Sequence, residues 1–160
     1  MAREGRHYCL VMSAVIRVLN TYEAEDVAPS LQRLISELSS SASGPDAATV
    51  AARVRDERVR VLVVERQGVI VGTATLSLLM TLWKGMVGHV DDVVVDATAR
   101  GEGLGRRLME KLHEEAAHLG LTHLDLTSRP TREAANALYQ SLGYEKRGTN
   151  VYRLRLRHDA

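Results

Sequence analysis

The feature that most constrains the fold of this chain is a glycine-rich turn between an apolar run and an amphipathic helix. The turn reads Arg-Gly-Glu-Gly-Leu-Gly at positions 100–105 and follows a valine-rich strand expected at 87–95. The apolar positions of the next segment lie three or four apart, which predicts a helix ended by Gly120: Leu104, Leu108, Leu112, Ala116 and Leu119. Since a strand is expected at 121–127, the whole segment predicts a βαβ crossover with two parallel strands.

The remaining patterns predict further strands and helices around this crossover. Helical spacing indicates helices over 27–38, from 45 to about 54, and over 132–142. Strands are expected at 14–19, 59–66, 69–82 and 151–157, and the turn at Gln67 and Gly68 joins the middle two into an antiparallel hairpin. The expected class is α/β (α+β), with a mixed central sheet of six to seven strands and about four helices.

Length and charge exclude several functional classes. The chain has 160 residues with 21 basic and 20 acidic side chains, so no net field attracts nucleic acid or an anionic membrane. The single cysteine, Cys9, rules out an internal disulfide framework, and no Cys/His set has zinc-site spacing. No run spans a bilayer and residues 1–6 do not resemble a signal peptide. We expect a cytoplasmic protein with one domain over 13–158 and a flexible extension over 1–12.

The turn at 100–105 has the chemistry of an anion site. It offers the helix no Ser, Thr, Asp or Asn cap, so the first backbone N–H groups remain available to a ligand. Glycines let a ligand approach closely, the helix dipole favours negative charge, and Arg100, Arg106 and Arg107 add positive charge. A pyrophosphate fits these features, although glycines can also serve turn geometry alone. A dinucleotide fingerprint would need glycine at Arg106, and no Gly-Lys-Ser/Thr of a P-loop follows.

The turn, together with positions 88–96 and 132–144, resembles the GCN5-related N-acetyltransferase (GNAT) superfamily, whose signature is Arg/Gln-x-x-Gly-x-Gly/Ala. The resemblance implies splayed central parallel strands, with the pantetheine arm of the co-substrate acetyl-CoA paired to the first of them and its pyrophosphate on the turn. No metal is implied. The cofactor-binding residues that it implies are Val93, Val94, Val95, Arg100, Gly101, Glu102, Gly103, Leu104, Gly105, Arg106 and Asn136.

By the same resemblance, candidate catalytic residues lie on the strand before the turn and on the last helix. Asp91 is the first candidate for the general base and His89 the second, and strand alternation predicts that both share a face with Val93 and Val95. The alternative is that Asp91 and Asp92 bind the acceptor's cation or cap a loop. Tyr139 is the candidate acid for the leaving thiolate, against the alternative that it is packed core.

The implied activity is transfer of an acetyl group to a primary amine by direct attack on the thioester. The expected acceptor is a small amine or an amino sugar. Arg129 or Arg132 could bind the phosphate of a sugar phosphate, although Arg132 could bind CoA instead. The acidic pair at 91–92 also favours a polyamine, and a protein N-terminus and a homodimer remain open. The second hypothesis is a non-catalytic acyl-CoA-binding or regulatory module of the same fold.

Overall fold

The computed structural model describes residues 14–38 and 44–156, and the chain divides into two compact units, Met1–Thr127 and Ser128–Ala160. The expected extension over 1–12 lies outside the described residues. A single domain over 13–158 stays a prediction, and each unit is described by itself.

The first unit contains a sheet whose five strands follow one another in chain order. They are β1 (Val15–Val18), β2 (Val59–Arg66), β3 (Val69–Thr81), β4 (Gly85–Val95) and β5 (Leu124–Leu126). The first four are antiparallel, whereas β4 and β5 are parallel. The predicted hairpin and the predicted βαβ crossover are therefore confirmed.

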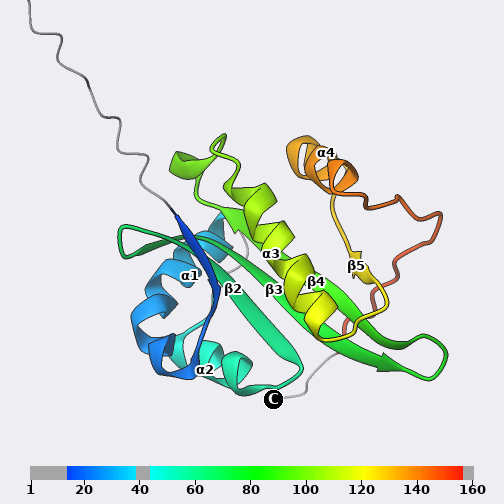
Figure 1. Ribbon diagram of the computed structural model, residues 1–160, viewed down its shortest axis with the longest axis horizontal. Helices are drawn as coiled ribbons and strands as arrows, with labels where there is room; N and C mark the ends of the chain where they lie inside the picture. Colours follow the sequence, from blue (N-terminus) through cyan, green and yellow to red (C-terminus); the bar gives the residue numbers. More distant parts are fainter. Residues whose placement is uncertain (1–13, 39–43, 157–160) are drawn as a thin grey trace, which may run out of the picture. The chain divides into compact units, whose positions relative to one another are not determined.

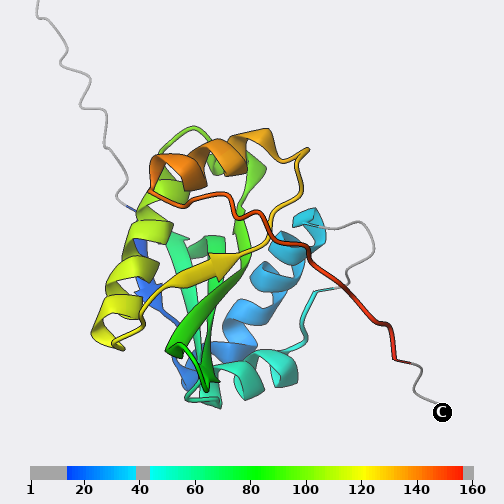
Figure 2. The ribbon, with the colours of Figure 1, turned by 90° about the vertical axis from the view of Figure 1, so that its right-hand side faces the viewer.

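Helices cover both faces of this sheet (Figures 1 and 2). Helices α1 (Ala24–Leu38) and α2 (Ala47–Arg55) lie on one face, and α3 (Leu104–His118) lies on the other. Two single 3-10 turns, η1 (Thr21–Glu23) and η2 (Ala97–Ala99), precede α1 and follow β4. Aliphatic side chains of α1 form one buried cluster with side chains of α2, β2, β3 and β4, in which Leu34 and Val63 have no exposed surface. This burial fixes α1 over the sheet.

The expected count of six to seven strands is wrong, because the described residues form five. The second unit contains α4 (Glu133–Ser141), which brings the α-helices to four as expected, but residues 151–156 form no regular structure. Their apolar side chains stay exposed, with Tyr152 at 87% and Leu154 at 83%. Alternation of apolar and basic residues predicted the two faces of a strand, but it carries no information about a pairing partner.

A β-bulge interrupts β4 where the sequence has two consecutive aspartates. Asp91 is opposite Thr75 and Val94 is opposite Thr73, so Asp92 and Val93 together face one residue of β3. Asp92 takes the left-handed conformation, with φ of 55°. Directly paired residues share a face, so Asp91 and Val94 lie on the α1 face. The prediction that Asp91 shares its face with Val93 and Val95 is wrong, because the extra residue reverses the alternation.

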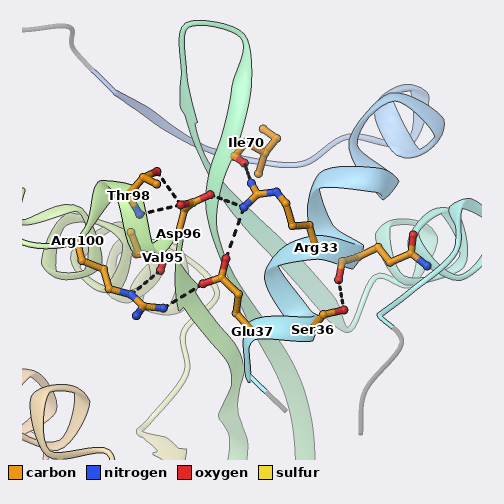
Figure 3. A network of polar contacts seen from close by, with 9 residues as sticks. Arg33, Ser36, Glu37, Ile70, Val95, Asp96, Thr98 and Arg100 are labelled. Atoms are coloured by element: carbon orange, nitrogen blue, oxygen red, sulfur yellow. Dashed lines mark hydrogen bonds and ion pairs between the residues drawn. The ribbon is translucent and has the colours of Figure 1, made fainter. Parts of the chain in front are cut away.

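A polar network joins α1 to the end of β4 and to the glycine-rich turn (Figure 3). Asp96 accepts hydrogen bonds from the backbone N–H and hydroxyl of Thr98, at 2.8 and 2.7 Å, and pairs with Arg33. Glu37 bridges Arg33 and Arg100, at 3.5 and 3.1 Å. The network therefore holds the C-terminal end of α1 beside the turn.

We expect Asp96→Asn to lower the free energy of unfolding at pH 7 by up to about 2 kcal/mol. The hydrogen bonds from Thr98 and the ion pair with Arg33 lower the pKa of the Asp96 carboxyl to about 2. A depressed folded-state pKa stabilises the fold above the unfolded value near 3.8, and that contribution is lost as the pH falls from there toward 2. Urea unfolding between pH 7 and pH 3 should show the two proteins converging on acidification.

The exposed Asp26→Asn in α1 serves as the control. A stability difference for Asp96→Asn that did not change with pH would contradict this account of the carboxylate.

Candidate functional site

The glycine-rich turn leads into α3 without a side-chain cap. Gly103 is the N-cap residue, in the left-handed conformation with φ of 75°, and Gly101 has φ of 83°. A Cβ at either position would meet nothing within 4 Å. These glycines are thus required by the backbone conformation, and the surface beside them is open. An uncapped helix start with open space suits a phosphate group, so the residues fit the pyrophosphate expected here.

The charged residues of the turn already have partners within the first unit. The Arg100 Nε donates to the carbonyl of Val95 at 3.0 Å, and its guanidinium pairs with Glu37, although its side chain remains 60% exposed. Glu102 accepts two hydrogen bonds of 2.9 Å from Arg66. Arg106 lies 3.7 Å from Glu110 on α3. A phosphate at the turn would therefore compete with Glu37 for Arg100.

A cavity of about 180 Å³ lies between the sheet and the helices α1 and α2. Its walls come from α1, the segment just before α2, one face of α2, and strands β2 to β4. The lining residues are Leu31, Ile35, Gly44, Pro45, Thr49, Val50, Arg53, Val61, Thr73, Thr75 and Asp92. Most of the surface of this lining is apolar, and its acidic residue comes from the bulge of β4.

Asp92 is the acidic residue that the bulge directs into the cavity. Its Oδ2 accepts a hydrogen bond from the Thr75 hydroxyl at 3.2 Å. Desolvation raises the pKa of the Asp92 carboxyl, although the residue as a whole is exposed. The charge of Asp91 acts in the same direction, while the Thr75 hydrogen bond and Arg53 oppose it. Sequence reasoning considered Asp92 only as a group that binds the acceptor's cation or caps a loop, since no residue pattern indicated the bulge.

The structure brings the two candidate bases together. His89 Nε2 lies 3.5 Å from Asp91 Oδ1, and the two side chains are 28% and 50% exposed. They are opposite Ser77 and Thr75 on β3, on the cavity's face of the sheet. Neither lines the cavity itself. Both side chains therefore reach solvent on the cavity's face of the sheet.

The expected acetyl-CoA segment of β4 lies beyond its pairing with β5. The parallel register covers three pairs and ends where Val90 meets Leu126. Residues 93–95 follow this last pair, and Val94 is buried on the α1 face. The strand therefore continues toward the turn after its parallel neighbour has ended.

The second unit holds the other two predicted site residues, both on α4. The side-chain amide of Asn136 donates to the carbonyl oxygens of Arg129 and Pro130, at 3.0 and 3.4 Å. Tyr139 is 6% exposed, and its ring meets that of Tyr144 edge to face, with centroids 5.9 Å apart. Burial raises the pKa of the Tyr139 phenol. The phenol is thus protonated at neutral pH.

Neither a metal cluster nor a spanning helix is found within residues 14–38 and 44–156. No three His, Cys, Asp or Glu side chains there are arranged to hold an ion. No helix in these ranges has both the length and the apolar character needed to cross a membrane.

Residues 25–144 match the model of the acetyltransferase (GNAT) family, which is three quarters of the chain. This chain belongs to the GNAT family. The matched range includes the glycine-rich turn, the bulged β4 and the helix that carries Tyr139.

Curated relatives of this GNAT chain have several different acceptors in their names. It is 36% identical over 90 residues to an IAA acetyltransferase of Azospirillum brasilense, covering 56% of this chain and 57% of that protein. It is 42% identical over 67 residues to a probable glucosamine 6-phosphate N-acetyltransferase 2 of Oryza sativa subsp. japonica, covering 42% and 39%. The matched part of this chain thus spans between about two fifths and little more than half of the length of these relatives.

Solved structures agree with the fold of this GNAT chain over most of its length. A Trypanosoma brucei acetyltransferase has a TM-score of 0.73 at 28% identity, covering 90% of this chain and all of that one. A ribosomal-protein-alanine N-acetyltransferase from Brucella melitensis biovar Abortus 2308 has a TM-score of 0.74 at 23% identity, covering 90% and 99%. Because its identity is only 23%, the likeness to the Brucella structure concerns the fold alone.

Proposed function

We propose that this chain is an acetyl-CoA-dependent N-acetyltransferase whose acceptor is a small primary amine bound in the cavity between α1, α2 and the sheet. The observation that carries the proposal is that Asp92 lines this cavity from the bulge of β4, the strand that leads to the glycine-rich turn. An amine is the acceptor that a carboxyl group in a largely aliphatic cavity binds best, because the ammonium form pairs with it.

The co-substrate acetyl-CoA, which the family implies, supplies an activated acyl thioester. Its pyrophosphate is assigned to the uncapped start of α3, at Gly101, Gly103 and Gly105, with Arg100 and Arg106 as nearby cations. The proposal assigns its pantetheine arm to residues 93–95 and to Asn136. Glu102 and Leu104, which lie between the glycines of the turn, complete the proposed cofactor-binding site.

The amine must lose a proton before it can attack the thioester. In the proposal Asp92, His89 and Asp91 share this task, and Tyr139 assists the leaving group. Asp92 holds and orients the amine in the cavity. The His89–Asp91 pair accepts the proton, directly or through water, and passes it to solvent, to which both side chains are exposed. Tyr139, whose raised pKa keeps it protonated, donates to the leaving sulfur.

This division predicts different kinetic effects for two adjacent aspartates. Asp92→Asn should raise the KM of the acceptor about tenfold or more, because the amide keeps the left-handed backbone but loses the charge that pairs with the ammonium. Asp91→Asn should mainly lower kcat, because it weakens the proton acceptor. Steady-state kinetics of both variants at saturating acetyl-CoA measure the split. Equal effects of both variants on KM alone would contradict it.

The proposed function is tested by measuring CoA release with a panel of primary amines, including glucosamine 6-phosphate, polyamines, amino acids and a peptide with a free N-terminal alanine. Amine-dependent release above hydrolysis is expected for at least one small amine. Calorimetric binding of acetyl-CoA without release by any acceptor would contradict catalysis and would favour an acyl-CoA-binding module.

A further inference from the structure

The acceptor cavity contains one basic side chain as well as an acidic one. Arg53 lies in the last turn of α2 and lines the cavity together with Asp92. Within the described residues, Arg53 forms no salt bridge, although its charge lowers the pKa of Asp92. A guanidinium without a carboxylate in contact can bind an anion from a ligand.

The two charges stand in a small cavity whose other walls are mostly aliphatic. Leu31 and Ile35 of α1, Val50 of α2 and Val61 of β2 form these walls. The Thr73 hydroxyl is already used, since it donates to the carbonyl of Leu62 at 2.9 Å. The volume of about 180 Å³ is below the roughly 300–1,000 Å³ typical of sites for drug-sized ligands. The cavity therefore suits a compact body with few hydroxyl groups.

We propose that the cavity selects a primary amine that also carries an anionic group on a short aliphatic body, with its ammonium beside Asp92 and its anion beside Arg53. This inference rests on the proposed function, since it names the acceptor class of the same site. The ammonium end belongs at Asp92 because this residue lies in the bulge of β4, next to the segment assigned to the thioester arm. The anion then lies toward the C-terminal end of α2.

The test compares matched acceptors and matched variants. The acceptors are ω-amino acids with four to six carbons and the n-alkylamines of the same length, since a carboxylate this distant leaves the basicity of the amine nearly unchanged. Glucosamine 6-phosphate and glucosamine form a second pair, in which the anion is a phosphate and the body a sugar. The variants are Arg53→Met and its control Arg55→Met, an exposed arginine in the same helical turn that does not line the cavity.

We expect the wild type to have at least about tenfold higher kcat/KM for an amino acid of the fitting length than for its alkylamine. Arg53→Met should reduce this ratio to below about threefold, chiefly by lowering activity on the amino acid, while Arg55→Met should leave it unchanged. Equal use of both acceptors by the wild type, or a ratio that survives Arg53→Met, overturns the proposal. A preference for glucosamine 6-phosphate over every amino acid would refute the part of the proposal that gives the acceptor a short aliphatic body.

The same experiment separates failure of this inference from failure of the proposed function. Release of CoA with simple amines but no preference for the anionic partner refutes the inference and leaves the acetyltransferase assignment standing. If no acceptor releases CoA, the assignment fails, and calorimetric titration of the amino acids and alkylamines into the wild type and Arg53→Met still decides the inference. Tighter binding of the amino acids that depends on Arg53 supports it, and equal binding refutes it.

Discussion

Gly103→Glu is expected to weaken acetyl-CoA binding by at least about 100-fold. The substitution brings a negative charge to the uncapped start of α3, where the pyrophosphate is assigned. Two like charges about 4 Å apart repel by about 4 kcal/mol at an effective dielectric constant near 20, which exceeds the approximately 2.7 kcal/mol of a 100-fold loss. Isothermal titration calorimetry with acetyl-CoA measures the effect.

The variant also adds backbone strain, because Gly103 has φ of 75°, and the control must share that strain. Gly120 provides it: this residue follows the other end of α3, has φ of 69°, and likewise has open space where a Cβ would stand. Gly120→Glu should lower stability by a similar amount while leaving acetyl-CoA affinity within about twofold. Unchanged affinity in a folded Gly103→Glu variant would refute the assignment of the pyrophosphate to this turn.

Tyr139→Phe is expected to lower kcat by about 10² with little change in acetyl-CoA affinity. A general acid contributes about 10² to 10⁴ in rate, and burial keeps the Tyr139 phenol protonated well above neutral pH. The substitution removes one hydroxyl and keeps the ring that packs against Tyr144, so the second unit should stay folded. Single-turnover and steady-state kinetics with an active acceptor measure the change.

Tyr144→Phe is the matched control for this experiment. Its ring contacts that of Tyr139, and burial raises the pKa of its own phenol to about 12. We expect kcat to change by less than about threefold in this variant. A similarly small change in Tyr139→Phe would mean that Tyr139 serves packing and that the thiolate departs without this acid.

The elements with long apolar patterns were predictable from the sequence. Helix α3 begins at Leu104, where the pattern begins, and strand β2 has the predicted bounds. The missing side-chain cap of α3 was also foreseen, because cap residues are identifiable by type. Helix α1 was predicted less well: it starts at Ala24, three residues before the predicted start at position 27, and Pro29 lies inside it.

The parts that escaped prediction depend on contacts distant in sequence. The bulge of β4 exists through its register with β3, and the residue pair Asp91-Asp92 alone suggests ordinary alternation. The cavity likewise combines residues from two helices and three strands that no local pattern relates. Family resemblance proposed His89, Asp91 and the turn as site residues, whereas it did not indicate that Asp92 lines a cavity.

The left-handed conformation of Asp92 limits how this site can diversify. Only Gly, Asn and Asp adopt φ near 55° without substantial strain, so nearly every substitution at position 92 carries a folding defect besides any effect on chemistry. Arg53 and Thr49, on the helical wall opposite, have ordinary helical backbones that accept many residue types. Evolution or engineering of new acceptors should therefore proceed through the cavity-facing side of α2, while position 92 remains nearly invariant.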